Sequence, residues 1–162
     1  MEARMEFKKM SAEEIHDVAK LYLQFAAHIW NEAGDQGVTI GNVTEADLLP
    51  ELESYSGDRD KIIYVAKESG RIVGFITGEI KSYLLAAAPL IKTGYVAGGY
   101  VVPEHRMKGL MKTLETMLMK FFDEHGVRQV ELNVMAGSAT GKKSWEALGY
   151  RTFREQMRKT IS

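Results

Sequence analysis

The feature of this sequence that most limits its fold is an abrupt change of hydrophobic pattern around residues 102–110. Residues 93–102 favour a strand, Pro103 ends it, and the turn that follows passes through Gly109. Apolar residues then recur at helical spacing until Gly126, where the helix is predicted to end. They are Leu110, Met111, Leu114, Met117, Leu118, Phe121 and Phe122. A strand that turns directly into a long amphipathic helix requires a sheet packed against helices.

The turn itself has the chemistry of an anion site. A strand that ends just before a helix exposes several unpaired backbone N–H groups at the positive end of the helix dipole. Gly109 lets a ligand approach the main chain, and Arg106, Lys108 and Lys112 add positive charge. These features favour a pyrophosphate above other anions. The alternative is an ordinary solvated turn, because basic residues and glycine precede many helices.

The rest of the chain predicts one α/β domain over residues 1–162, with a mixed sheet and helices on both faces. A capping box opens a helix at Ser11, and Pro50 is expected to delay or kink a second, weaker helix at 44–55. Gly98 and Gly99 indicate a bulge in a strand. Residues 28–43 read as a loop and 140–148 as a short helix. Strands are expected at residues 5–10, 61–67, 72–83, 93–102, 127–134 and 150–158.

Composition narrows the functional classes. The chain has 162 residues, no cysteine and a formal charge of -1, so we expect no disulfide, no thiolate metal site and no general attraction to nucleic acid. The four histidines have no ligand spacing, and we therefore expect no metal. The longest apolar run is too short to span a bilayer, and the N-terminus does not resemble a signal peptide. A cytoplasmic protein without a membrane partner is the expectation.

Two motifs resemble those of the GNAT acetyltransferases. Residues 106–111 (Arg-Met-Lys-Gly-Leu-Met) are similar to the Arg/Gln-x-x-Gly-x-Gly/Ala signature of that family, and they follow a Val-x-Pro-Glu strand end. Residues 144–150 (Ser-Trp-Glu-Ala-Leu-Gly-Tyr) are similar to its x-Tyr-Glu-x-x-Gly-Phe ending, at the expected distance. The resemblance implies a GNAT fold, whose mostly antiparallel mixed sheet splays between its fourth and fifth strands.

The resemblance also implies acetyl-CoA as cosubstrate, without a metal. The turn amides would hold the pyrophosphate, and the pantetheine would lie in the splayed sheet beside the end of the fourth strand. A backbone N–H of that strand would polarise the thioester carbonyl. The residues expected to bind the cosubstrate are Tyr100, Val101, Arg106, Met107, Lys108, Gly109, Leu110, Met111, Lys112, Ser138 and Trp145.

Several positions depart from the family pattern. Met111 replaces the second small residue and is expected to point into the core, and Ser138 replaces a common asparagine. Trp145 stands where many members carry a tyrosine acid, and Asn133 where some carry a glutamate base. An indole N–H is no useful acid. The candidates that remain for acid–base catalysis are Tyr100, Glu79 and water, although each side chain could equally be structural.

The expected activity is N-acetyl transfer by direct attack of a primary amine, carried by a small molecule or a peptide. The alternative is a catalytically silent sensor or interaction domain that binds acyl-CoA. Residues 28–55 are expected to select the acceptor, with Asp35, Glu45 and Asp47 as charges that could attract a cation. The apolar segment 84–91 could form a homodimer interface, a wall of the acceptor site or part of the core.

Overall fold

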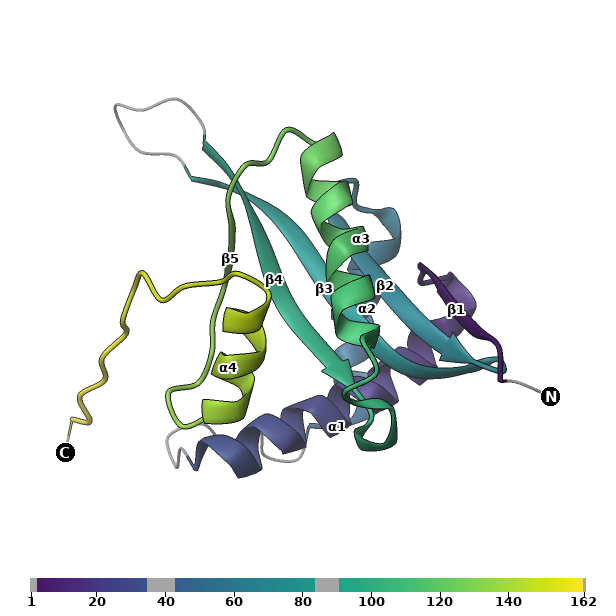
Figure 1. Cartoon of the computed structure of the whole chain (residues 1–162), viewed down its shortest axis with the longest axis horizontal. Coiled ribbons are helices and arrows are strands. Elements are labelled where there is room, and N and C mark those ends of the chain that lie inside the picture. The colour runs from purple at the N-terminus through teal and green to yellow at the C-terminus, as the bar shows by residue number, and fades with distance from the viewer. Residues whose placement is uncertain (1–2, 35–42, 84–90, 162) are drawn as a thin grey trace.

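A computed structural model of the chain describes residues 3–34, 43–83 and 91–161. Its sheet has the strand order β1 (Met5–Lys9), β2 (Lys61–Glu68), β3 (Arg71–Tyr83), β4 (Ile91–Val101) and β5 (Val130–Leu132). The first four strands pair antiparallel, and β5 runs parallel to β4 (Figure 1). This arrangement confirms the mixed, mostly antiparallel sheet.

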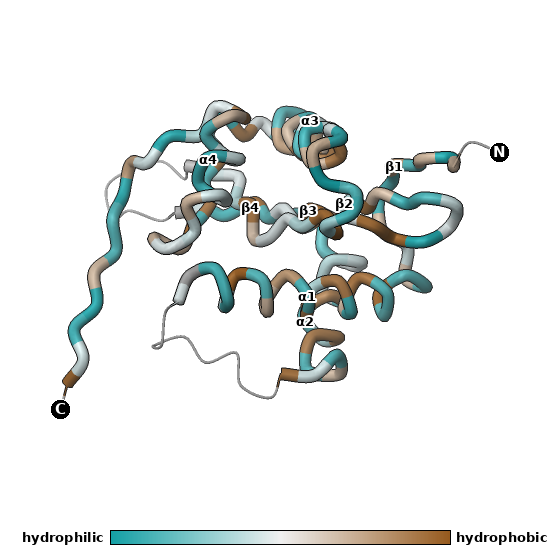
Figure 2. Tube along the Cα trace, turned by 60° about the horizontal axis from the view of Figure 1, so that its bottom comes forward, coloured by the Kyte–Doolittle hydropathy of each residue, from teal (hydrophilic) through white to brown (hydrophobic). Residues whose placement is uncertain are grey.

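Helices cover both faces of the sheet, as predicted. The helix α1 (Ile15–Ala33), which follows the short 3-10 turn η1 (Ala12–Glu14), lies with α2 (Glu45–Gly57) on one face. The helices α3 (Leu110–Glu124) and α4 (Ala139–Ala147) lie on the other, and a second 3-10 turn, η2 (Pro103–His105), precedes α3. Figure 2 shows the sheet between these two helical layers. Among the described residues, no helix is long and apolar enough to cross a bilayer.

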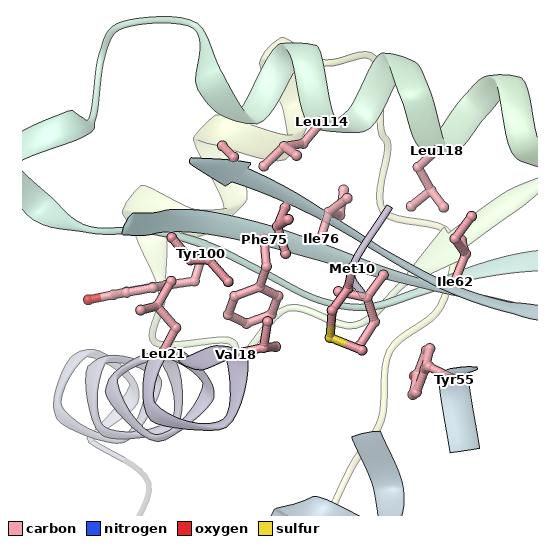
Figure 3. Packing of buried hydrophobic residues seen from close by; sticks show 14 of the residues in the cluster. Met10, Val18, Leu21, Tyr55, Ile62, Phe75, Ile76, Tyr100, Leu114 and Leu118 are labelled. Carbon is pink, nitrogen blue, oxygen red and sulfur yellow. The ribbon is translucent and has the colours of Figure 1, made fainter. Parts of the chain in front are cut away.

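The core consists of side chains that alternate between the two faces of the central strands. On β3, Phe75 packs among the side chains beneath α1, and Ile76 lies on the opposite face under α3 (Figure 3). The residues Val18, Leu114 and Leu118 are fully buried in the helices that supply the two layers. The 3.6-residue spacing of α3 therefore aims one helical face at the sheet.

The start of α1 is fixed by Glu14. Its carboxylate accepts hydrogen bonds from the Ser11 amide at 2.9 Å, from Lys8 at 2.8 Å and from Lys67 at 2.5 Å. Burial alone would raise the pKa of Glu14, but these donors lower it to about 2. The predicted capping box is confirmed, and it ties α1 to β1 and β2.

Several sequence predictions of element bounds were wrong. The helix α1 continues through residues read as a loop and ends at Gly34, whose φ is 59°. The helix α2 begins at Glu45 behind a Thr44 capping box, and Pro50 lies within it without delaying its start. The strand β5 has three residues in place of the predicted eight-residue strand. Residues 151–161 form no strand although residues 150–158 alternate like one, because the described sheet gives them no partner. The apolar segment lies outside the described residues, except for Ile91 at the start of β4.

Two irregularities open the sheet at one place. The β3–β4 register shifts between Thr77 and Gly78, so that Ala97 is the extra residue on β4 just before Gly98. This is the bulge that the paired glycines predicted. The strand β4 also pairs with β5 only from Gly94 to Val96. Beyond the bulge, residues 97–101 of β4 have no pairing with β5 among the described residues, which is the expected splay.

Candidate active site

The turn between β4 and α3 combines two left-handed residues with the start of a long helix. Met107 has a φ of 61° and Gly109, the N-cap of α3, has a φ of 79°. A Cβ atom added at Gly109 would meet nothing within 4 Å, so the main chain there is open. The side chain of Met107 is fully exposed. The left-handed backbone at residue 107 is strained for a methionine and must be held by its surroundings.

The amides of this turn are available for a ligand. Across the described residues, no backbone acceptor is recorded for the amides of residues 107–112; the next amide, of Thr113, donates to the Gly109 carbonyl at 3.1 Å. These N–H groups lie at the positive end of the α3 dipole, where they favour a bound anion. Lys108 and Lys112 are exposed beside them. The turn therefore fits a pyrophosphate in both hydrogen bonding and charge.

Arg106 has a structural role at the same place. Its Nε donates to the Val101 carbonyl at 2.9 Å, and its guanidinium lies 5.3 Å from the centre of the Tyr100 ring. The side chain thus ties the turn to the end of β4. The structure brings Tyr100, Val101 and Arg106 together as a support for the turn, although Tyr100 and Val101 are themselves only 7% exposed.

The open edge of β4 has different walls on its two faces. On the α3 side, a Cβ atom at Gly99 would lie 3.2 Å from Met111 and 3.5 Å from Trp145. Met111 packs against the core, as its sequence position predicts, and Leu110 is buried beside it. Trp145 also contacts Tyr150 edge to face at 5.5 Å. A side chain at position 99 would press on the flexible end of Met111, which would have to shift slightly.

On the α1 side, the bulge faces a tyrosine. A Cβ atom at Gly98 would lie 2.9 Å from the Tyr22 hydroxyl oxygen. The Thr77 hydroxyl donates to the Gly98 carbonyl at 3.3 Å. Burial raises the pKa of Tyr22, which keeps its hydroxyl protonated at neutral pH. Tyr22 is therefore a hydrogen-bond donor beside the bulge and not a base.

Glu79 belongs to a polar cluster farther along the α1 and α2 face. The Tyr55 hydroxyl donates to its carboxylate at 2.5 Å, and the Lys81 ammonium lies 3.9 Å away. The ammonium of Lys81 also lies 3.7 Å from the centre of the Tyr95 ring, and the Asn133 amide donates to the Tyr95 hydroxyl at 2.9 Å. We call this set of five residues the Glu79 cluster. Its side chains come from α2, β3, β4 and the end of β5.

The two catalytic candidates do not meet. Glu79 pairs in register with Tyr95, whereas Tyr100 pairs with Phe75, four residues away on β3. Four strand steps separate the two positions by about 13 Å. The two candidates for acid–base catalysis therefore lie at different points along the sheet, Tyr100 near the end of β4 and Glu79 in the Glu79 cluster.

The Ser138 hydroxyl, which was expected to bind the cosubstrate, makes a hydrogen bond within the protein. This buried N-cap residue of α4 donates to the Glu32 carboxylate at 3.0 Å, and His28 lies 3.2 Å from the same carboxylate oxygen. His28 and Glu32 lie one helical turn apart on α1, so the contact connects the end of α1 to the start of α4. Ser138 faces the protein interior in this state.

Sequence reasoning missed Tyr22 at the bulge and three members of the Glu79 cluster, which are Tyr55, Lys81 and Tyr95. Tyr22 follows the apolar spacing of α1, and only the structure shows its hydroxyl at the bulge. Tyr55 and Tyr95 lie 40 residues apart on separate elements. No local pattern joins them to Glu79. Of the charges expected to attract an acceptor, Asp47 caps α2 and Glu45 lies 3.3 Å from His16, whereas Asp35 lies outside the described residues.

The described residues contain no group of three or more His, Asp or Glu side chains that could hold a metal ion.

No curated protein matches the sequence. The fold has many counterparts among solved structures. An aminoglycoside N-acetyltransferase, AAC(6')-Iy in complex with CoA, matches 99% of this chain and 97% of its own with a TM-score of 0.77 and 14% identity.

Two further structures extend the likeness. A mutant of the BH1408 protein from Bacillus halodurans matches 97% of this chain and 99% of its own, with a TM-score of 0.83 and 19% identity. Glucosamine-6-phosphate N-acetyltransferase from Arabidopsis thaliana matches 98% and 99%, with a TM-score of 0.67 and 24% identity. Identities this low establish the fold alone.

The family follows from the sequence match. The family model described as "Acetyltransferase (GNAT) family" matches residues 21–150, which include the turn, the open edge of β4 and the Glu79 cluster. The chain belongs to the GNAT acetyltransferase family.

Proposed function

We propose that this protein transfers an acetyl group from acetyl-CoA to a primary amine of a small molecule or a peptide. The observation that carries the proposal is a row of amides, at residues 107–112, that have no backbone acceptor among the described residues. This row lies beside the part of β4 that the described residues of β5 leave unpaired. A diphosphate fits the first feature and an extended acyl arm fits the second. Two of the structural neighbours are named as N-acetyltransferases of amine substrates, which agrees with this chemistry.

The reaction needs little covalent chemistry from the protein. The amine nitrogen forms a bond to the thioester carbonyl carbon, the carbon–sulfur bond breaks, and the thiolate leaves. The amine must also lose a proton. Holding both reactants beside the bulge removes much of the entropic barrier, and a fixed backbone N–H of β4 stabilises the developing negative charge on the carbonyl oxygen.

Glu79 is our proposed proton acceptor, acting directly or through water. Its carboxylate lies on the same face as the Tyr22 hydroxyl and is held by Tyr55. A carboxylate there also attracts the cationic form of an amine. Tyr100 is a weaker candidate because its ring is buried against Arg106. Tyr22, which stays protonated, is placed to donate a hydrogen bond near the bulge.

A thiol-release assay tests the activity. Acetyl-CoA is incubated with the protein and a panel that contains an aminoglycoside, glucosamine-6-phosphate and a peptide with a free N-terminus. We expect free CoA thiol to appear in step with at least one amine. CoA binding without turnover on any amine would instead favour the acyl-CoA sensor, whose motivation is Trp145 and Asn133 at the family's usual acid and base positions.

The role of Glu79 has a separate test. Glu79→Gln keeps an acceptor for the Tyr55 hydroxyl but removes the base, so kcat is expected to fall about 100-fold with little change in KM for acetyl-CoA. Glu53→Gln, on the exposed side of α2, is the matched control and is expected to be neutral. If Tyr100→Phe lost more activity than Glu79→Gln, the assignment would be wrong.

A further inference from the structure

The ammonium group of Lys81 lies between an aromatic ring and a carboxylate. Its nitrogen is 3.7 Å from the centre of the Tyr95 ring and 3.9 Å from Oε2 of Glu79. The face of a tyrosine ring attracts a cation, and a carboxylate attracts it more strongly where water is partly excluded. The ring and the carboxylate together form a site for a primary ammonium group, which Lys81 fills in this structure. We call it the ammonium site.

The two walls of the ammonium site do not depend on Lys81. The Tyr55 hydroxyl donates to Oε1 of Glu79 at 2.5 Å, and the Asn133 amide donates to the Tyr95 hydroxyl at 2.9 Å. Glu79 is opposite Tyr95 in the register of β3 and β4, so both side chains stand on the same face of the sheet. Because neither hydrogen bond involves Lys81, the site keeps its form when that side chain moves away.

Lys81 is held loosely in the ammonium site. At 3.9 Å its nitrogen is beyond hydrogen-bond distance of Oε2, and no donor to Oε2 is recorded among the described residues. Its side chain is 43% exposed, on a flexible four-carbon stem. Lys61, the partner of Glu79 on β2, is bound elsewhere, since its ammonium donates to the Ser54 hydroxyl at 3.2 Å. A ligand whose nitrogen comes closer to Oε2 can therefore displace Lys81.

The charges around the ammonium site favour a cation. Burial is the main cause that raises the pKa of Tyr22 and of Tyr55, and the negative charges of Glu51 and Glu79 raise the pKa of both further. Both hydroxyls therefore stay protonated and neutral near pH 7. The negative charge of this face is carried by the carboxylates, with Glu79 closest to the Tyr95 ring.

The ammonium site also lies close to the bulge of β4. Thr77, whose hydroxyl donates to the Gly98 carbonyl, is two residues from Glu79 on the same face of β3, a separation of about 7 Å. Lys81 is attached two residues farther from the bulge. A small amine that is held at Glu79 can thus approach an acyl group at the bulge, whereas Lys81 reaches the site from the side away from it.

We propose that Lys81 is an internal substitute for the acceptor, and that the acceptor is a cationic amine that displaces the Lys81 ammonium from between Tyr95 and Glu79. The inference rests on the proposed acetyl transfer and narrows its substrate class. Lys81 weakens the binding of every cationic amine in proportion to the fraction of molecules in which it fills the site. Neutral and acidic compounds gain nothing there, because they cannot replace an ammonium group.

Nuclear magnetic resonance tests the site without acetyl-CoA. In protein labelled with carbon-13 at the lysine ε position, the current of an aromatic ring shifts the signal of a lysine above it upfield. The Lys81 signal, identified by its absence from Lys81→Arg, should show this shift and lose it in Tyr95→Leu. Butylamine, a cation at neutral pH, should move the signal toward that of an exposed lysine. Butanol and an equal concentration of potassium chloride should not. A Lys81 signal that is unshifted, or that butylamine leaves in place, would overturn the proposal.

Lys81→Met tests the displacement in the reaction, since it keeps an apolar stem and removes the charge. For an amine of the thiol-release panel that is turned over, KM is expected to fall about 5-fold, with kcat and the KM for acetyl-CoA unchanged. Lys61→Met is the matched control and should change the acceptor KM by less than about 2-fold. An acceptor KM that stays the same or rises in Lys81→Met would contradict the proposal, because a rise would mean that Lys81 helps to hold the acceptor.

Substitutions of Tyr95 test the other wall of the ammonium site. Tyr95→Leu removes the ring and should raise the acceptor KM about 3-fold. Tyr95→Phe keeps the ring face and should retain more of the affinity than Tyr95→Leu. If the two variants lost equal affinity, the hydroxyl and its bond to Asn133 would matter in place of the ring, and the ammonium site would be wrong.

The spectroscopic and kinetic tests separate this inference from the proposed function. Displacement of Lys81 by butylamine without acetyl transfer to any amine of the panel would support the ammonium site and contradict the proposed function. Acetyl transfer together with a Lys81 signal that butylamine does not move would support the function and overturn the inference.

Discussion

Two turns of this protein each contain a left-handed non-glycine residue and a left-handed glycine, in different surroundings. The β2–β3 turn places Ser69 at a φ of 49° and Gly70 at 88°. The turn before α3 places Met107 at 61° and Gly109 at 79°. Each combines a strained non-glycine residue with a left-handed glycine that has open space where a Cβ atom would lie. The positive φ values alone do not show which turn binds an anion, although Ser69 and Gly70 are adjacent and Lys108 separates Met107 from Gly109.

The two turns differ in the hydrogen-bond partners of their backbone amides. The Ser69 amide donates to the Arg4 carbonyl at 3.1 Å, and β3 then pairs with β2 from Arg71 to Glu79. The amides of residues 107–112 have no such partner among the described residues, and they begin a helix beside the unpaired edge of β4. A left-handed turn becomes an anion site when a helix start leaves its amides free.

The largest difference in CoA affinity is expected when the left-handed glycine of each turn is replaced. Gly109→Val should raise the dissociation constant for CoA about 100-fold, because the side chain would occupy the space of the phosphates and the backbone would resist φ near 79°. Gly70→Val carries the same backbone cost and should leave CoA binding unchanged. Calorimetry with CoA measures the affinity, and thermal melts check that both variants lose similar stability. Equal losses of affinity would break the comparison.

Removing the positive charges beside the two turns should give a smaller difference in CoA affinity than the glycine substitutions. Lys108→Ala with Lys112→Ala is expected to weaken CoA binding about 10-fold at low salt, and the loss should shrink as salt screens the phosphates. Arg71→Ala removes an exposed cation at the hairpin turn and should have little effect. A loss that does not depend on salt would mean that the lysines act through the fold and not through charge.

The turns are also in contact, which gives a third test. The buried His105 in η2 bonds Glu68 at the end of β2 with 2.7 Å between the ring and the carboxylate, and its Nδ1 has no hydrogen-bond partner within the described part of the chain. Glu68→Ala would leave both ring nitrogens unpaired, which should cost about 1–3 kcal/mol of stability. We also expect about 5-fold weaker CoA binding as η2 loosens.

The control for that link is the exposed pair of Arg71 and Glu104, 3.4 Å apart. Glu104→Ala should leave stability almost unchanged, since exposed ion pairs contribute little. Chemical denaturation compares the two variants. If Glu104→Ala cost as much as Glu68→Ala, the buried contact would not be what supports the turn.

The smallest effect concerns the two strained residues. Met107→Gly and Ser69→Gly should each stabilise the protein by up to about 1 kcal/mol, because glycine adopts a positive φ without strain. Only Met107→Gly should also tighten CoA binding, by about 2- to 3-fold, since it relaxes the turn that holds the ligand. Thermal melts and calorimetry measure both. A tighter complex from Ser69→Gly would contradict the separation of the two turns.

The sequence predicted the turn before α3 better than it predicted the Glu79 cluster. Pro103, Gly109 and the α3 stripe are adjacent in the chain, so local rules located the turn, the bulge and the layers. The Glu79 cluster depends on tertiary contacts between four elements, which local patterns do not specify. Sequence also placed Arg106 at the rim with the lysines, whereas the structure turns it back to Val101.

Residues 150–158 show the other limit. Their alternation predicted a strand, which the structure does not form, because a strand needs a neighbour and the described sheet supplies none. The strand prediction failed because pairing depends on where neighbouring strands lie in the fold, which local alternation does not specify. The bounds of α1 failed for a simpler reason: Gly34, and not the polar residues before it, ends the helix.

Titration calorimetry with CoA at low salt tests the central claim most directly. The account predicts one binding site per chain, heat that weakens as salt is added, and loss of that heat in Gly109→Val but not in Gly70→Val. A well-folded protein that gives no heat with CoA or acetyl-CoA would contradict it, and so would binding that survives Gly109→Val unchanged.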